Sequence, residues 1–572
     1  MGTISDKLMR IINTKEDIRQ ALISKGYDVP TSIPFKEYAK MISDLPCRVD
    51  SFPDIEGIVA RYSALGLTNE QMAANPVWVD KTGNGHDLQM KNFAWKEGSG
   101  ISDIYPGALV FDGVDDYGTC DNFPILTKEK GYTVVALRQW ITRGEGALGL
   151  VSNVKNWINN GAFLLEYRNI QADHFNKPIS FGAIGSENDL PHIFTYQTSK
   201  SYNGVSITTG NFEGTDVLHV GKLAPTNVGT CINAAIWELV FLDHDATEEE
   251  LTKIKDYFVK TYPWLFPDQA WTVTGKTNED KDRATIANIT GNGNDLILQN
   301  FGFAEGSGYG LYAQNYISYA ITNRAVYTKT NSSIHVTKSI TAGVNFTESA
   351  RGVTIPSYRI KVTGIQSGQE MIYRGSNNTF LTNIPSDGIY VLPAVEKGSN
   401  LGFQFVSYTG DCDITIEQIP EYEGYLVTDG VDDKVQSSSF TMNEDWTIVG
   451  DWELLSNVQI NCGIVKAQNV YLYNTANGLL ISINNPRSLQ SFGTKSLHAI
   501  CSDGRLYDRN WVEYEYTVDQ NFEIVESSLN IGFNLNNYTQ IAFKNLGIYN
   551  NQILSKDDCI KAYNYLQTLK SK

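Results

Sequence analysis

An internal duplication constrains this chain of 572 residues more than any other feature of its sequence. Residues 66–70 read GLTNE, and residues 275–279 read GKTNE. Residues 82–100 read TGNGHDLQMKNFAWKEGSG, and residues 290–308 read TGNGNDLILQNFGFAEGSG. Because both pairs of motifs occur in the same order, the sequence predicts two copies of one fold.

A third pair of motifs shows where the two copies differ in length. Residues 109–117 read LVFDGVDDY, and residues 426–434 read LVTDGVDDK. In the second copy this motif lies much farther from the preceding one, which predicts an inserted domain over residues 311–422. Each copy then closes with a strand and a capped helix, which begins after Thr247 in the first copy and after Ser555 in the second.

Between the motifs, short runs of β-branched and aromatic residues alternate with clusters of Asn, Gly and Asp. Residues 132–136 and 446–450 are such runs in the two copies, and residues 357–363 form one in the insertion. The 48 glycines, the 11% aromatic content and the low charged fraction of 19% favour strands and turns over helical bundles. Short strands at regular intervals are typical of β-sandwiches and jelly rolls.

The paired TGNG(H/N)DL and DGVDD motifs resemble the LamG-like jelly rolls of the concanavalin A-like lectin and glucanase superfamily. The resemblance covers residues 51–265, and residues 266–310 together with 423–572. It implies a mainly β chain with two concanavalin A-like jelly rolls, the second of which carries an inserted β-sandwich at residues 311–422. A small helical segment at residues 1–47 precedes them.

The arrangement as a whole resembles virion structural proteins of the crAss-like bacteriophages, which infect gut Bacteroidales, and of their relatives. Those proteins often begin with a helical pattern that is matched here by DKL at residues 6–8, Lys15, and KG at residues 25–26. Residues 357–364, SYRIKVTG, and residues 414–422, ITIEQIPEY, also resemble segments that recur in them. The resemblance implies a fibre, spike or decoration subunit that displays lectin-like domains.

Residues 1–47 differ in pattern from the rest of the chain. Apolar residues recur at helical spacing from Leu8 to Leu22, and a second short amphipathic segment follows Pro30. Two helices of this size bury too little surface to be stable alone, so we expect them to dock on something larger. The partner is either another virion protein or a sister subunit, which would make the segment an anchor, or the adjacent jelly roll, which would make it a cap.

The net charge limits the partners that we expect. The chain carries 46 Lys and Arg against 64 Asp and Glu, a formal charge of −18 that repels phosphate backbones, so we expect no nucleic-acid partner. No apolar run reaches the roughly 18 residues of a membrane helix, and charged residues interrupt the N-terminal region where a secretory signal would lie. Together with the resemblance, this predicts a homo-oligomer that is assembled in the host cytoplasm and located in the virion.

The acidic residues of the DGVDD motif allow two interpretations. Asp112, Asp115 and Asp116 are clustered hard oxygen ligands, the type that Ca²⁺ prefers, and calcium is the one cofactor that the sequence leaves open. An Asp-Gly-Val-Asp-Asp turn before a strand also satisfies its own backbone amides without a metal. The sequence favours the structural turn, with calcium as the alternative.

A glycan site needs an aromatic ring against the apolar face of a sugar, and polar side chains for the hydroxyl groups. Trp157, Asn159 and Asn160 supply these groups in a glycine-bounded stretch, and Tyr167 follows one strand later. These residues are our candidates for adhesion to host surface polysaccharide. The alternative is that Trp157 fills the sandwich core and the asparagines only turn the chain.

The cysteines do not form a recognisable motif. The seven cysteines are scattered without a CxxC pair, which predicts isolated reduced thiols in the core rather than disulfides or a zinc site. Asp411 and Asp413 flank one of them, Cys412, but lack the glycine and the distal glutamate of an EF-hand loop. We interpret that stretch as a turn.

The sequence favours a protein that is not an enzyme. It contains no HExxH and no GxSxG motif, and it lacks the strand-borne E-x-D-x-E acids of concanavalin-like glycoside hydrolases. Glu166 and Glu238 are isolated by comparison. The alternatives are a polysaccharide depolymerase, whose acids would come from separate strands, and a bacterial surface adhesin.

Overall fold

The structure is a computed structural model that describes most of the chain from residue 52 onward. The described residues are Lys15, Arg19, 52–126, 131–142, 148–153, 164–167, 192–197, 215–222, 231–321, 325–339, 345–348, 354–376, 379–396, 401–406, 410–455, 463–467, 470–475, 478–483, 490–492, 496–516, 527–531, 533–534 and 537–571. The helical segment predicted at residues 1–47 lies outside them, apart from Lys15 and Arg19. Across the described residues, strands pair into facing sheets, so the predicted mainly β fold class is confirmed.

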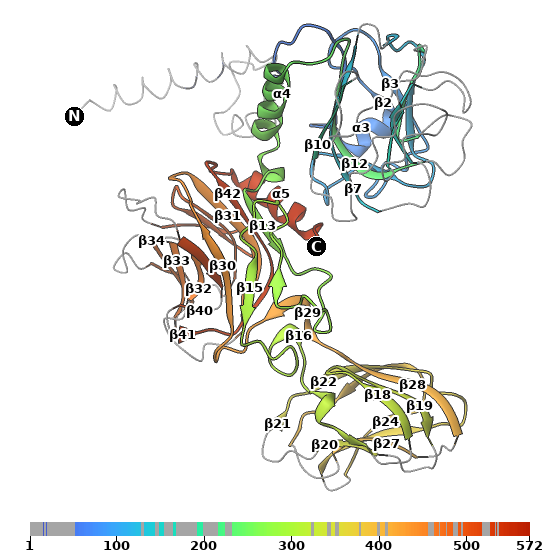
Figure 1. The fold of residues 1–572 in the computed structure, drawn as a ribbon, viewed down its shortest axis with the longest axis vertical. Coiled ribbons are helices and arrows are strands. Elements are labelled where there is room, and N and C mark those ends of the chain that lie inside the picture. Colours follow the sequence, from blue (N-terminus) through green and yellow to red (C-terminus); the bar gives the residue numbers. More distant parts are fainter. Residues whose placement is uncertain are drawn as a thin grey trace, which may run out of the picture.

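Three β-sandwiches follow one another along the long axis of the molecule (Figure 1). We call residues 52–265 roll 1, residues 266–311 with 421–571 roll 2, and residues 312–420 the inserted sandwich. Roll 2 lies in the middle, between roll 1 and the inserted sandwich (Figure 1). Among the described residues, no helix is both long enough and apolar enough to cross a membrane.

Roll 1 consists of two antiparallel sheets. In the described residues, one sheet has the order β10-β7-β12-β5-β4, with β1 beside β12, and the other has the order β2-β3-β6-β11-β8-β9. The bounds are β1 Ile58–Ser63, α3 Asn69–Ala74, β2 Val77–Trp78, β3 Leu88–Lys91, β4 Gly100–Ile101, β5 Leu109–Asp112, β6 Tyr117–Cys120, β7 Thr133–Trp140, β8 Leu148–Ser152, β9 Leu164–Tyr167, β10 His192–Gln197, β11 Leu218–Val220 and β12 Asn233–Leu242.

The burial of each strand in roll 1 follows from what covers its two faces. In β3, buried and exposed residues alternate, because one face packs in the sandwich and the other meets solvent. All of β7 is buried. Val134 and Ala136 face the core between the sheets, whereas Val135 and Leu137 belong to a second apolar cluster on the outer face.

Roll 2 repeats this architecture with more strands in each sheet. In the described residues, the orders are β16-β29-β42-β31-β36-β37-β38, with β13 beside β42, and β14-β15-β30-β39-β32-β33-β34-β35. The bounds are β13 Gln269–Thr272, β14 Thr285–Ile286, β15 Leu296–Gln299, β16 Gly308–Leu311, β29 Glu421–Val427, β30 Lys434–Phe440, β31 Trp446–Leu454, β32 Gly463–Ala467, β33 Val470–Thr475, β34 Gly478–Ile483, β35 Gln490–Phe492, β36 Leu497–Cys501, β37 Arg505–Asp508, β38 Glu513–Glu515, β39 Ser527–Ile531, β40 Phe533–Asn534, β41 Asn537–Tyr538 and β42 Ile541–Asn550.

Each roll ends with the capped helix that the sequence predicts. In roll 1, α4 spans Glu248–Thr261, and Thr247 and Glu250 form a reciprocal capping box. The 3₁₀ helix η1, Pro263–Leu265, then leads into roll 2. In roll 2, α5 spans Lys556–Gln567, and the Ser555 hydroxyl accepts a hydrogen bond from the Asp558 backbone amide at 3.1 Å.

One apolar cluster joins the two rolls. The Tyr549 hydroxyl of β42 donates a hydrogen bond to the Trp264 carbonyl of η1 at 2.9 Å, and the Lys561 ammonium of α5 lies 4.3 Å from the centroid of the Trp264 ring. Because buried side chains of α4, η1 and α5 pack together, the rolls share a continuous interior. Its buried members include Val135, Leu137, Trp237, Val240, Ile254, Phe258, Trp264, Val449, Ala499, Cys501, Tyr549, Leu554, Cys559, Tyr565 and Leu566.

The inserted sandwich consists of two further antiparallel sheets. In the described residues, their orders are β17-β20-β27-β23-β24 and β18-β19-β28-β22-β25, and β21 pairs with β26. The bounds are η2 Tyr316–Ser318, β17 Ala320–Ile321, β18 Ala325–Lys329, β19 Ser333–Ser339, β20 Asn345–Glu348, β21 Thr354–Ile355, β22 Tyr358–Thr363, β23 Met371–Arg374, β24 Phe380–Ile384, β25 Gly388–Leu392, β26 Val395–Glu396, β27 Leu401–Phe405 and β28 Gly410–Ile419.

The inserted sandwich leaves and re-enters roll 2 at one point of one sheet. Leu311, the last residue of β16, pairs with Glu421, the first residue of β29. Just beyond, the side chain of Gln418 bonds the backbone amide and carbonyl of Gln314 at 3.1 and 2.8 Å. The Asn331 side chain also donates to the Phe303 carbonyl of roll 2 at 2.7 Å. These contacts hold the inserted sandwich at the end of roll 2.

The interpretation of Asp411 and Asp413 as a turn is wrong, because both lie within β28. Their neighbours Cys412 and Ile414 are buried, and this alternation requires an extended strand. The two carboxylates are exposed and reach side chains of β19: Asp413 lies 2.6 Å from the His335 ring nitrogen, and Asp411 lies 3.5 Å from the Lys338 ammonium.

Candidate functional site

The DGVDD motif of roll 1 forms a turn between β5 and β6. One oxygen of Asp112 accepts hydrogen bonds from the backbone amides of Val114 and Asp115 at 2.8 and 3.3 Å. The buried carboxylate of Asp116 accepts one from the Asp112 amide at 3.0 Å and one from the Ser99 hydroxyl at 3.1 Å. The carboxylates therefore serve the turn and connect it to the loop that precedes β4.

Roll 2 repeats the same turn between β29 and β30. Asp429 accepts hydrogen bonds from the amides of Val431 and Asp432 at 2.7 and 3.2 Å. Asp433 accepts one from the Asp429 amide at 2.7 Å and one from the Ser307 hydroxyl at 3.5 Å. Two turns with the same partners indicate a structural role that both copies retain.

A cation in these turns would compete with bonds that already exist. The carboxylate oxygens of Asp112, Asp115 and Asp116 lie within 4.8 Å of one another, and the same holds for the equivalent set at residues 429–433. Burial raises the pKa of Asp116 to about 7, because loss of hydration disfavours its charged form. The turn interpretation fits the geometry better, and calcium remains a prediction.

The GLTNE and GKTNE motifs hold the same neighbouring loop in each roll. In roll 1, the Asn69 amide bonds both backbone groups of Ile101, each at 2.8 Å. In roll 2, Asn278 does the same to Tyr309, at 2.7 and 3.5 Å. In each roll the asparagine side chain bonds the backbone amide and carbonyl of one residue on an edge strand, as a neighbouring strand would do. Only an amide side chain offers both a donor and an acceptor in this way, which explains why both motifs contain asparagine.

The TGNG motifs are held by the residue two positions before each one. One oxygen of Asp80 accepts hydrogen bonds from the amides of Arg61 and Thr82, both at 3.0 Å. Its equivalent, Asn288, accepts from the amides of Ala270 and Thr290 at 3.3 and 3.1 Å. The exchange of Asp for Asn preserves the oxygen that accepts these two amide bonds, so this pair of bonds requires an oxygen and not a charge.

Glu238, which stands isolated in the sequence, is paired in the structure. It lies on β12, fully buried, and its carboxylate bonds Arg61 of β1 at 3.1 and 3.2 Å. The Tyr262 hydroxyl donates to it at 2.7 Å, and Arg61 donates to the Tyr257 hydroxyl of α4 at 2.8 Å. Because these partners satisfy the pair, it ties α4 to the sheet.

The predicted glycan residues fall in part outside the described residues. Trp157, Asn159 and Asn160 lie in the undescribed stretch between β8 and β9. Tyr167 is the last residue of β9, where its backbone pairs with that of Leu148. In the described residues, β9 is the edge strand of its sheet. The stretch with Trp157 therefore joins the last two strands at one edge of roll 1.

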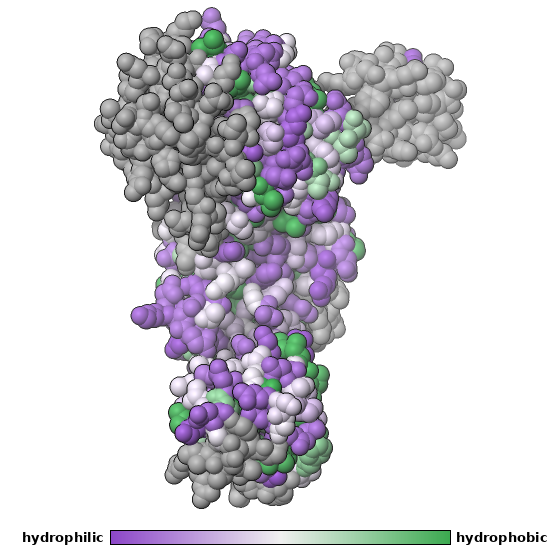
Figure 2. Space-filling model, turned by 90° about the vertical axis from the view of Figure 1, so that its right-hand side faces the viewer, coloured by the Kyte–Doolittle hydropathy of each residue, from purple (hydrophilic) through white to green (hydrophobic). Residues whose placement is uncertain are grey.

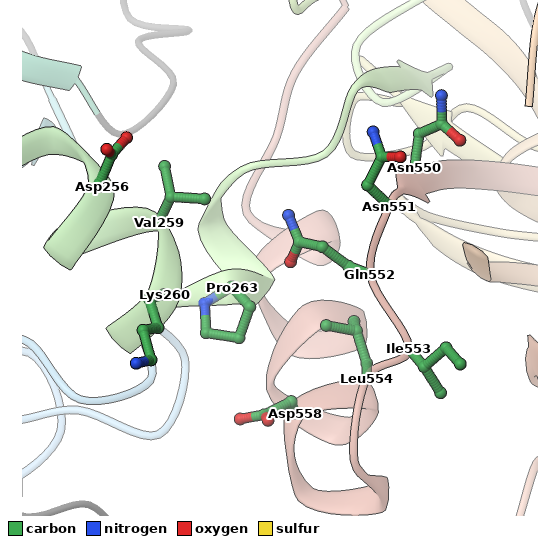
Figure 3. Close-up of a pocket in the computed structure, with 10 residues that line it drawn as sticks. All are labelled: Asp256, Val259, Lys260, Pro263, Asn550, Asn551, Gln552, Ile553, Leu554 and Asp558. Atoms are coloured by element: carbon green, nitrogen blue, oxygen red, sulfur yellow. The ribbon is translucent and has the colours of Figure 1, made fainter. Parts of the chain in front are cut away.

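A pocket of about 510 Å³ lies where the two rolls meet (Figure 3). The sequence contains no signal for it, because its walls come together only when α4 of roll 1 docks beside the segment between β42 and α5 (Figure 3). Its lining residues are Asp256, Val259, Lys260, Pro263, Asn550, Asn551, Gln552, Ile553, Leu554 and Asp558.

The pocket combines an apolar wall with free polar groups. Val259, Pro263 and Ile553 supply apolar surface. The Gln552 carbonyl oxygen of the side chain is shielded from solvent and has no hydrogen-bond partner among the described residues. Asp256 is an exposed carboxylate on the opposite wall. The volume of the pocket and the polar groups in its lining suit a small molecule that carries hydroxyl groups.

The five described cysteines are buried, as the prediction of core thiols requires, but two of them are not isolated from one another. Cys501 ends β36 and Cys559 lies in the first turn of α5, and both side chains are fully buried. Both thiols donate to the Leu554 carbonyl, Cys501 at 3.9 Å and Cys559 at 4.0 Å. No spacing rule predicts this pair, because the docking of α5 on the sheet brings the residues together.

The comparisons with known proteins do not place the chain in a family. No protein-family model matches it, and no curated protein matches it. A Trypanosoma rangeli sialidase in complex with sialic acid is similar with a TM-score of 0.24 and 11% identity, over 44% of this chain and 39% of that one. Another structure of a Trypanosoma rangeli sialidase has a TM-score of 0.24 and 13% identity, over 45% of this chain and 39% of that one.

The chain thus spans about two fifths of the length of these sialidase structures. A similarity of this size assigns neither an activity nor a ligand to this protein.

Proposed function

We propose that this chain is a structural protein of a bacteriophage virion, a fibre, spike or decoration subunit that displays its jelly rolls without catalysing a reaction. The observation that supports this most is the continuous apolar cluster between the rolls. A shared core makes the two rolls one stiff unit, and the inserted sandwich extends that unit along its long axis (Figure 1). Such a shape suits display at a distance from an attachment point.

The surface also fits a solvated display module. Hydrophilic residues cover most of the described surface on one side of the molecule, and hydrophobic residues appear there only in small separate patches (Figure 2). A surface of this kind stays in water and does not favour burial against a large apolar partner. We therefore assign attachment to the virion to residues 1–47, and we propose that the rolls remain exposed to solvent.

Deletion of residues 1–47 tests the anchoring role. We expect the shortened protein to fail to enter particles when it is supplied in place of the full chain during phage assembly. A thermal unfolding curve of the purified variant serves as the control, because the rolls should keep their midpoint. Normal incorporation of a correctly folded deletion variant would contradict the anchor.

We further propose that the rolls bind glycans of the host surface. The stretch with Trp157, Asn159 and Asn160 offers a ring and amides, Tyr167 follows later in the sequence, and the junction pocket offers carboxylate and amide groups. The two candidate sites, the stretch with Trp157 and the junction pocket, can be distinguished by mutation. Binding through the stretch requires Trp157, whereas binding in the pocket requires Asp256.

A glycan array with purified protein tests the two places. If the stretch is the site, Trp157→Ala should abolish binding and Asp256→Ala should leave it unchanged; the pocket predicts the reverse. Tyr327→Ala, which removes an exposed ring from the inserted sandwich, is the matched control. Absence of binding by the unmodified protein would contradict adhesion and leave a purely architectural role.

A further inference from the structure

Two buried cysteines meet where α5 docks on the sheet of roll 2. Cys501 lies at the end of β36 and Cys559 at the beginning of α5. Both thiols donate a hydrogen bond to the same carbonyl oxygen, that of Leu554, with sulfur–oxygen distances of 3.9 Å for Cys501 and 4.0 Å for Cys559, so both sulfur atoms lie against one backbone atom. The other described cysteines are Cys120, Cys231 and Cys412, which lie in roll 1 and in the inserted sandwich.

The backbone around the pair is held in place from both sides. The Leu554 carbonyl also accepts a hydrogen bond from the Arg505 guanidinium at 3.2 Å. The Leu554 amide donates to the Thr447 hydroxyl of β31 at 2.9 Å. The segment that leads into α5 is thereby fixed to β31 and β37, so the two sulfur atoms remain neighbours as long as the helix is docked.

The surroundings give the two thiols different roles. The adjacent Cys559 thiol, followed by the charge of Arg505 and the nearby Thr447 hydroxyl, lowers the pKa of Cys501 in spite of its burial. The neighbouring Cys501 thiol, followed by burial, raises the pKa of Cys559. Cys501 is therefore the better nucleophile of the pair.

We propose that Cys501 and Cys559 form a reversible disulfide that fastens α5 to roll 2 and secures the junction of the rolls. The oxidant is a small-molecule disulfide such as oxidised glutathione. The Cys501 thiolate attacks it, forms a mixed disulfide and releases one small thiolate. Cys559 then loses its proton and attacks the Cys501 sulfur, which releases the second small thiolate.

The electrons and protons of this exchange balance. Two protein thiols are oxidised to one disulfide, and one small disulfide is reduced to two thiols, which take up the two protons. The reagent can approach from the junction pocket, because Leu554 and Asp558 line it and lie next to the thiol pair. Local opening of the first turn of α5 is then enough to expose both sulfur atoms.

Peptide mapping after oxidation tests the proposal on the full chain. The protein is incubated with oxidised glutathione at neutral pH, and its remaining thiols are alkylated in denaturant. We expect a cross-linked peptide pair that contains Cys501 and Cys559 and has lost the mass of two hydrogen atoms. Cys412→Ala should leave this product unchanged, whereas Cys559→Ala should accumulate glutathione on Cys501.

Two outcomes of this mapping would overturn the disulfide. One is alkylation of both residues even after incubation at a temperature where α5 opens. The other is cross-linking of a different pair of cysteines.

Thermal unfolding tests whether the bond fastens the helix. The oxidised protein should unfold at a temperature higher by about 5 °C than the reduced protein, because the cross-link restricts the unfolded chain. A reductant should abolish the difference, and Cys501→Ala should never show it. Equal unfolding temperatures of fully oxidised and fully reduced protein would overturn the fastening role.

Discussion

Asp116 and Asp433 are carboxyl groups that the fold withdraws from water. Each accepts a serine hydroxyl and a backbone amide, and burial raises the pKa of each to about 7. A group whose pKa is higher in the folded state binds protons more tightly there, so folding is favoured most where the group is protonated. The stability that these two residues contribute is therefore present at acid pH and is lost as the pH rises toward 7.

The direction of this pH dependence gives a first prediction for the free energy of unfolding. Between about pH 7 and pH 5, the unmodified protein should become more stable relative to an Asp116→Asn, Asp433→Asn variant, which cannot titrate at these positions. Denaturant unfolding at several pH values measures the difference. Calcium should leave both curves unchanged; a rise in stability of the unmodified protein alone would favour the calcium interpretation instead.

Gly308 illustrates how tightly a repeated motif is packed. Its φ is 130°, and a Cβ there would lie 2.5 Å from the side-chain oxygen of Asn278 and 2.9 Å from the Cα of Phe303. Gly308→Ala should therefore lower the free energy of unfolding of roll 2 by about 2–3 kcal/mol. Gly306→Ala is the matched control, because its φ is 87° but nothing lies within 4 Å, and we expect a loss of about 1 kcal/mol. Equal losses would contradict the packing argument.

At the scale of elements, the two rolls have different residues at one pair of equivalent positions on neighbouring strands. Arg61 of β1 and Glu238 of β12 form the buried ion pair of roll 1, with Ser63 opposite Glu238 in the register. In roll 2, β13 and β42 have the same pairing, with Thr272 opposite Asn545. The Arg61 position is then taken by Ala270, so both charges are absent together.

A double-mutant cycle tests the coupling between these strands. Arg61→Ala or Glu238→Asn alone should cost about 3–5 kcal/mol, because each leaves one buried charge without its partner. The double variant, which reproduces the residues of roll 2, should cost clearly less than the sum of the two. Chemical denaturation measures all four proteins, and strictly additive losses would show that the pair is not coupled.

At the scale of the whole molecule, the inserted sandwich is attached through one strand pair. Because Leu311 and Glu421 face each other, a two-residue Asn-Gly turn can replace residues 312–420. We expect the shortened protein to keep the unfolding midpoint of the rolls within about 3 °C, since the core of the inserted sandwich is separate from theirs. Scanning calorimetry measures this, and loss of roll 2 folding would show that the insertion is needed to complete it.

Local patterns in the sequence were enough to predict the fold class and the helix caps. Thr247 and Glu250 cap the helix through backbone groups a few residues away, so the meaning of this pattern does not depend on the rest of the chain. The structure adds that the repeated motifs are hydrogen-bonded supports. A motif shows which residue type is needed, but its bonding partner is found only in three dimensions.

The sequence by itself determined the alternation of strands and turns, the duplicated motifs and the two closing helices, because these depend on interactions between near neighbours along the chain. Only the tertiary structure decided the Arg61–Glu238 pair, the junction pocket and the contact of Cys501 with Cys559. Each joins residues that are distant in sequence: strand pairing brings Arg61 to Glu238, and the docking of helices forms the pocket and the cysteine contact. That docking follows from the burial of one large apolar cluster, which no single stretch of sequence encodes.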